Sequence, residues 1–168
     1  MKRIFLVFTL AIFVITISNA QVSPIAKGQK QLNFGTGLSS WGLPLFLGVD
    51  YGVHPDITIG GEISYRGYHD KWNSHKYHHT IYGISGNGNY HFNRIMDIPS
   101  NWDFYAGINL GFFIWSSESG YGGSGTSGLG LGAQIGGRYY WSDKWGINLE
   151  FGGGNAFGGG KVGLSMKF

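Results

Sequence analysis

Alternation between apolar and polar residues recurs along most of this chain, and it is the feature that most constrains the fold. Residues 102–114 place Trp, Phe, Ala, Ile, Leu, Phe and Ile at every second position, with Asp, Tyr, Gly, Asn and Gly among the residues between them. Residues 57–65 and 129–139 show the same period. Because successive side chains of a β-strand point to opposite faces, this period predicts strands with one apolar and one polar face.

Eight segments follow this rule. The other five are weaker and comprise residues 32–38, 45–51, 82–92, 145–151 and 158–168. Turn-forming residues separate the segments in two alternating sets: residues 52–56, 93–101 and 142–144, and residues 39–44, 68–79, 116–127 and 152–155. Each set then lies at one end of the sheet. We predict an all-β fold, an eight-stranded antiparallel transmembrane up-and-down β-barrel.

The positions of the aromatic residues indicate whether the apolar face contacts lipid or packs inside a soluble protein. One group sits at the strand ends of the first turn set: Tyr51, Phe92, Trp102, Tyr139, Trp141, Trp145 and Phe168. A second group lies nearer the other end: Tyr65, Tyr82, Phe112 and Phe151. Two aromatic bands around an apolar zone are typical of a barrel in lipid. A soluble sandwich or lipocalin-like barrel is the alternative, but its outward face would be charged. The shorter turns are expected in the periplasm and loops 68–79 and 116–127 outside the cell.

The first twenty residues have the pattern of a secretory signal. Lys2 and Arg3 precede an apolar run over residues 4–17, and Ser18-Asn19-Ala20 supplies a small-x-small cleavage site before Gln21. The run is shorter than the roughly 20 residues that a membrane-spanning helix needs. We therefore expect a cleaved signal peptide at 1–20, a short N-terminal segment at 21–28 and one barrel domain at 29–168.

Charge and cysteine content exclude several classes of partner and linkage. Removing Lys2 and Arg3 from the twelve basic residues leaves ten against nine acidic ones, so no basic patch indicates nucleic-acid binding. The chain has no cysteine, which excludes disulfides and lipid attachment of the lipoprotein kind.

The last eight residues resemble the β-signal that outer-membrane proteins present to their assembly machinery. A polar residue, a glycine two positions later, an apolar residue and a terminal aromatic are all in place: Lys161, Gly163, Met166 and Phe168. Recognition of an edge strand reads backbone hydrogen bonds and alternate side chains, which this pattern supplies.

With these features the chain resembles the small outer-membrane β-barrel family, of the OmpX and OmpA transmembrane-domain type common in Bacteroidetes. The resemblance covers residues 29–168 and rests on architecture and the terminal signature. It implies a place in the outer membrane of a Gram-negative bacterium. The implied partners are outer-membrane lipid and lipopolysaccharide, the barrel assembly machinery, periplasmic chaperones, and an extracellular ligand or surface.

Charged residues of the polar face should point into the lumen. They are Asp50, Glu62, Arg66, Asp103, Arg138, Glu150, Lys161 and Lys167. In a narrow barrel such charges are expected to pair and fill the interior. A path for protons or ions is the alternative interpretation.

Four of the six histidines fall in the loop predicted at 68–79, which offers these recognition candidates: His69, Trp72, His75, His78 and His79. A borderline metal such as Zn or Cu held by His75, His78 and His79, helped by His69 or Asp70, is one interpretation. A general recognition surface is the other. No metal ligand or cofactor is assigned.

No catalytic residue is assigned either. Lipid A deacylase barrels use a spaced His and Ser, whereas His91 here is followed by Phe92 and Asn93. The leading hypothesis is a structural or surface-interaction barrel. The alternatives are a narrow conduit for a small apolar molecule, suited by Phe46, Phe113 and Trp115, and a lipid-modifying enzyme.

Overall fold

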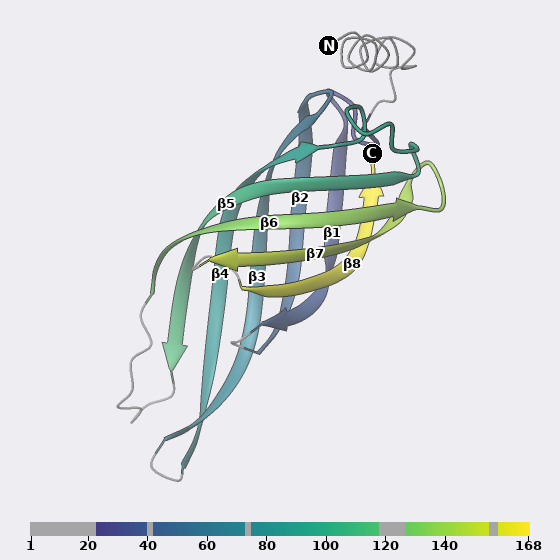
Figure 1. The fold of residues 1–168 in the computed structure, drawn as a ribbon. Coiled ribbons are helices and arrows are strands. Elements are labelled where there is room, and N and C mark those ends of the chain that lie inside the picture. The colour runs from purple at the N-terminus through teal and green to yellow at the C-terminus, as the bar shows by residue number, and fades with distance from the viewer. Residues whose placement is uncertain (1–22, 40–41, 73–74, 118–126, 155–157) are drawn as a thin grey trace, which may run out of the picture.

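The computed structural model describes residues 23–39, 42–72, 75–117, 127–154 and 158–168. Eight antiparallel strands follow one another around a closed barrel, and β1 pairs with β8 to complete it (Figure 1). The strands are β1 Lys30–Ser39, β2 Leu43–His54, β3 Ile57–Trp72, β4 His75–His91, β5 Trp102–Ser117, β6 Gly128–Tyr140, β7 Trp145–Gly154 and β8 Gly159–Lys167. The predicted fold class and strand count are confirmed. No helix in the described residues is long and apolar enough to span a membrane.

The barrel wall is apolar outside and mostly polar inside. Along β2 the exposed residues include Leu45, Leu47 and Val49, whereas Phe46, between the first two, and Asp50, directly after Val49, are buried. Most buried side chains of the described residues are polar or charged. The polarity of this wall is therefore the reverse of a soluble barrel, and it is the polarity that a surrounding lipid phase requires.

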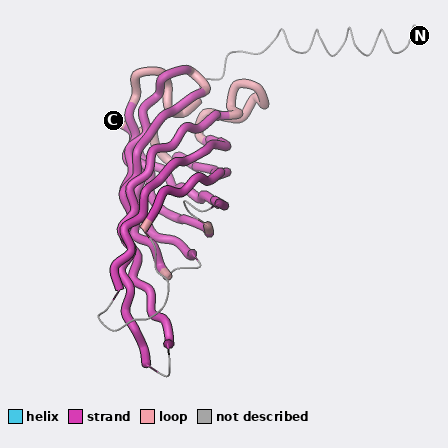
Figure 2. The backbone as a smooth tube through the Cα atoms, turned by 90° about the vertical axis from the view of Figure 1, so that its left-hand side faces the viewer, coloured by secondary structure: helices cyan, strands magenta, loops and turns pink. Residues whose placement is uncertain are grey.

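β4 is the longest strand with 17 residues, β3 and β5 have 16 each, and the hairpin of β3 and β4 projects beyond the barrel (Figures 1 and 2). Pairing of β3 with β2 ends at Gly67, and pairing of β4 with β5 ends at His79. The two strands continue to pair with each other as far as Trp72 and His75. The prediction of a loop at 68–79 is wrong. Polar residues occupy both faces here, so the apolar period disappears although the ladder of backbone hydrogen bonds continues.

The opposite end of the barrel holds the chain termini. Ile25 of the N-terminal segment and Ile98 of the turn between β4 and β5 are both buried. The backbone N–H of Gly28 donates to the carbonyl of Gly52 at 2.8 Å, which ties the segment to the end of β2. The expected signal peptide at 1–20 lies outside the described residues.

The seam between β1 and β8 requires close approach of two backbones. Gly35 and Gly163 are direct register partners. A Cβ on Gly163 would lie 2.2 Å from the carbonyl oxygen of Phe34 and 3.0 Å from the ring of Phe46. Only glycine fits at this point of the closure.

Candidate functional site

Arg138 is the centre of the arginine cluster, defined here as Arg138, Asp50 and Asp103. Its Nη2 donates to Asp50 Oδ2 at 2.7 Å, and its Nη1 donates to Asp103 Oδ2 at 3.0 Å. All three side chains are buried. Asp103 is the register partner of Arg138 on the neighbouring strand, whereas Asp50 comes from β2. One guanidinium therefore ties β6 to β5 and across the lumen to β2.

His91 extends this cluster to β3. Its Nδ1 lies 2.7 Å from Asp103 Oδ1, and its Nε2 lies 3.0 Å from Thr58 Oγ1. An ionised carboxylate only accepts hydrogen bonds, so Nδ1 carries the hydrogen in this contact. The order of hydroxyl, imidazole and carboxylate is that of a catalytic triad. Thr58 is 0% exposed, however, and neither Thr58 nor His91 lines the two lumen cavities described below.

Lys161 is the centre of the second group, the lysine cluster, defined as Lys161, Glu62 and Glu150. Its Nζ donates to Glu62 Oε2 at 2.8 Å and lies 2.6 Å from Glu150 Oε1. The hydroxyl of Tyr105 donates to Glu150 Oε2 at 2.8 Å. The Tyr105 ring also lies under Arg138, with 4.3 Å between the guanidinium carbon and the ring centroid. Tyr105 thus links the two clusters.

A row of hydrogen-bonded amide side chains runs from β4 to β6 on the inner face of the barrel. Gln134 Nε2 donates to Asn89 Oδ1, and Asn109 Nδ2 donates to Gln134 Oε1, both at 2.7 Å. Gly107 stands between Asn89 and Gln134 in the register. A Cβ there would lie 2.2 Å from Asn89 Oδ1, so glycine leaves the room in which the two amides meet. Sequence reasoning missed this row, although the inward parity of Asn89, Gly107 and Gln134 was a usable signal.

The remaining predicted lumen charges contact aromatic rings. The guanidinium carbon of Arg66 lies 5.6 Å from the ring centroid of Phe113, which packs with Ile81 and Trp115. The Nζ of Lys167 lies 4.1 Å from the ring centroid of Tyr140, outside both clusters. Cations positioned over ring faces are held there by the ring quadrupole.

The lumen contains two small cavities among these side chains. Each has a volume of about 20 Å³. Glu62, Asn87, Glu150 and Lys161 line both of them. A water molecule needs at least about 10–15 Å³, so each cavity has room for about one water.

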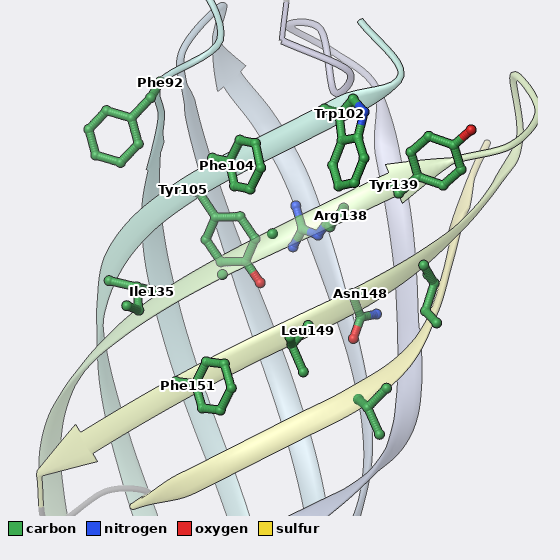
Figure 3. Close-up of a pocket in the computed structure, with 14 residues that line it drawn as sticks. Phe92, Trp102, Phe104, Tyr105, Ile135, Arg138, Tyr139, Asn148, Leu149 and Phe151 are labelled. Carbon is green, nitrogen blue, oxygen red and sulfur yellow. The ribbon is translucent and has the colours of Figure 1, made fainter. Parts of the chain in front are cut away.

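Larger hollows lie on the outer wall. The first has a volume of about 740 Å³, and Figure 3 shows Trp102, Phe104, Tyr139, Leu149 and Phe151 around it. The second, of about 620 Å³, is lined by residues of β2 to β6. Most of their lining residues are apolar residues of the outer wall, with Arg138 and Tyr105 also lining the first and Glu62 the second. They are depressions in the apolar surface.

The residues predicted as an assembly signal have different positions in the barrel. Lys161 points into the lumen, and Gly163 lies at the seam. Met166 pairs in register with Leu32 and is half-buried. Phe168 is 60% exposed, while its backbone N–H donates to the carbonyl of Lys30 at 2.9 Å.

The projecting hairpin, defined as residues 68–72 and 75–79, carries the predicted recognition residues. His69 and His78 are exposed register partners whose ring centroids lie 3.6 Å apart. His79 is 0% exposed, with its ring centroid 5.5 Å from that of Trp115, so its assignment to the recognition surface is wrong. Neighbouring residues of a strand point to opposite faces, which also separates His79 from His78 as metal ligands. The side chains of Trp72 and His75 lie outside the described residues.

No group of three or more His, Cys, Asp or Glu residues with metal-site geometry occurs in the described part of the chain. The metal interpretation built on His75, His78 and His79 includes His75, whose side chain lies outside the described residues, so this search does not test it.

Comparison with known proteins supports the fold. No family model and no curated protein sequence matches the chain. Among solved structures, the outer membrane protein OprG from Pseudomonas aeruginosa aligns with a TM-score of 0.69 at 10% identity, over 87% of this chain and 99% of that chain. Neisserial surface protein A aligns with a TM-score of 0.56 at 18% identity, over 83% and 95% of the two chains.

A third similar structure is Ail, the attachment invasion locus protein of Yersinia pestis, in complex with the heparin analogue sucrose octasulfate. It has a TM-score of 0.56 at 12% identity, with 84% of this chain and 99% of that chain covered. These identities show a shared fold. The chain has the closed eight-stranded fold of small outer-membrane barrels, and these matches do not single out the OmpX type.

Proposed function

We propose that the chain is an outer-membrane barrel whose lumen is closed by its own side chains and whose work is done by the projecting hairpin. The apolar outer wall supports residence in lipid, because large apolar side chains are exposed on all eight strands. The shared fold with outer-membrane proteins supports the same location. The OmpX and OmpA type is part of this proposal, supported by the strand count and the terminal octapeptide.

The packing of the lumen supports closure. Two ionic clusters, an amide row and the ring of Tyr105 occupy the interior, and the two cavities among them have volumes of about 20 Å³ each. Phe46 and Phe113, which suited an apolar conduit, are buried under Lys161 and Arg66. An apolar molecule would have to displace both cations, so the conduit is not favoured.

The observation that carries the surface role is the projection of β3 and β4 beyond the strands on either side of them. Their pairing continues past Gly67 and His79, the last residues paired to β2 and β5. A barrel that only spans lipid needs strands of about 9–11 residues. The residues beyond Gly67 and His79 therefore serve a purpose outside the membrane, where the hairpin extends past the pairing that β2 and β5 form within the described part of the chain.

The residue types of the hairpin indicate that its binding partner is an anionic surface. Residues 68–79 contain Lys71, Lys76 and four histidines against a single Asp70. Heparin is a suitable probe, because the similar barrel Ail was solved with a heparin analogue. Enzyme activity is not part of the proposal, since the triad-like Thr58 is buried.

The test is a shortened hairpin. Gly67 and Thr80 are direct register partners, so an Asn-Gly turn can join them in place of residues 68–79. Cells that produce the original protein should bind immobilised heparin, and cells with the shortened form should not. A K71S/K76S variant, which keeps the hairpin, should bind weakly. Equal binding by all three, at equal surface levels, would refute the role of the hairpin.

A further inference from the structure

Two exposed imidazoles meet across the projecting hairpin, and we propose that they form a binding site for a divalent transition metal, with Cu²⁺ bound most tightly. His69 on β3 and His78 on β4 are direct register partners. Their ring centroids are 3.6 Å apart, with an interplanar angle of 61°. The inference goes beyond the proposed surface role and does not depend on it.

The hairpin holds the two rings together before any metal arrives. Directly opposed residues of an antiparallel pair have Cβ atoms about 4.5–5.5 Å apart. The ladder continues in register on both sides of the pair, from Gly67 with Thr80 to Lys71 with Lys76. Less conformational freedom is therefore lost on binding than if the two histidines lay on separate flexible loops.

The distance between the rings suits one shared ion. Metal–nitrogen bonds to imidazole are about 2.0–2.1 Å, so two coordinating nitrogens lie no more than about 4 Å apart. Rings in contact reach this geometry by rotation about χ2, which is a soft torsion in histidine. No movement of the backbone is needed. Water completes the coordination shell, because both rings are exposed.

The surroundings of the pair favour the metal that bonds most strongly to imidazole. His79 points to the opposite face and is 0% exposed, so it is not a third ligand. Lys71 and Lys76 form the second register pair beyond the histidines, and lysine is not a metal ligand of the kind that His supplies. Cu²⁺ stands at the top of the affinity order for divalent ions of the first transition row. It is therefore the ion that two imidazoles and water should bind most tightly.

The experiment is titration of the purified protein in detergent with CuCl₂, followed by calorimetry and electron paramagnetic resonance. We expect one Cu²⁺ per chain with hyperfine structure from two imidazole nitrogens. H69A and H78A should each lower the affinity at least about tenfold. H54A is the matched control, because His54 is 53% exposed at the other end of the barrel, and it should bind as the original protein does. Lowering the pH should release the metal, since protons compete for imidazole.

Three results would overturn the proposal. They are no binding by the original protein, unchanged affinity in both H69A and H78A, and loss of affinity in H75A without loss in H69A. Gel migration of unheated samples checks that each variant is folded, and substitution of exposed hairpin residues should leave it unchanged. None of these results affects heparin binding by cells, so the proposed surface role is tested separately.

Discussion

Arg138 binds two buried carboxylates, one on the neighbouring strand and one across the lumen. It binds carboxylates from β2 and β5, and one of those carboxylates also binds His91. Isolated ions in such a place would lose their hydration without compensation. Each charged group of this cluster therefore needs its partners for stability more than the members of a surface ion pair do.

Replacement of Arg138 by methionine should destabilise the barrel strongly. R138M leaves Asp50 and Asp103 buried without their cation, and loss of one partner of a buried pair costs about 3–5 kcal/mol of unfolding free energy. Adding D50N and D103N to R138M should recover much of the loss. Urea unfolding in lipid vesicles measures both effects.

K167M is the control for this experiment, because Lys167 lies over Tyr140 and belongs to neither cluster. A partly exposed charge contributes at most about 1 kcal/mol. If R138M unfolded at the same urea concentration as K167M, the arginine cluster would not have the structural role given to it here.

The sequence predicts to which face of a strand a side chain points, but it predicts only some of the contacts that this side chain makes. Period two placed Asp103 and Arg138 on the inner face, and neighbouring strands then brought them together. The contact between Arg138 and Asp50 joins residues 88 positions apart across the lumen. It depends on the closure and stagger of the barrel, which a linear pattern does not specify.

At the scale of elements, β8 has two separable tasks. Its glycine at 163 allows the wall to close against β1, and the ring of Phe168, which directly follows the strand, is exposed. The first task belongs to folding itself, whereas the second belongs to recognition during assembly. Two substitutions distinguish them.

G163A should impair folding even without assembly machinery. The added Cβ meets the backbone of β1, and overpacking of this kind costs about 1–3 kcal/mol. Refolding of the purified chain into detergent should give a lower yield than for G153A, where a Cβ would meet nothing within 4 Å. Equal yields would mean that the seam tolerates a side chain.

Removal of Phe168 should have the opposite effect: it should impair assembly in cells and leave refolding of the purified chain unchanged. The purified truncated chain should refold normally, because the ring is exposed and not part of the packed interior. In cells its level in the outer membrane should fall, since the assembly signal is incomplete. Normal levels in the outer-membrane fraction would show that the terminal octapeptide is not read as proposed.

The hairpin is the element that sequence reasoning described worst. All eight strands could be placed because each carries an apolar face for the wall, and the loss of that face at residue 68 looked like the start of a loop. The projecting ribbon is held by pairing between two polar strands, and polar residues on both faces leave no hydrophobic period. Backbone pairing without burial has no comparable signature in a single sequence.

For the whole molecule, eight strands set the radius of the barrel and its side chains set what remains of the lumen. Interiors of this size hold side chains or one small ligand, whereas barrels of about 16 strands enclose a water channel. The strand count was therefore enough to predict a narrow interior. The interior is filled by long inward side chains that converge from opposite walls, such as Arg138, Lys161 and Tyr105.

Conductance of the purified protein in a planar lipid bilayer tests most directly whether the lumen is closed and the work is done at the surface. We predict silence, or rare small steps, because paired charges and the ring of Tyr105 occupy the path between the two cavities of about 20 Å³. Membranes with inserted, heat-modifiable barrel provide the control for incorporation. Frequent openings at porin-like conductance would contradict the account and make the lumen the working part of the protein.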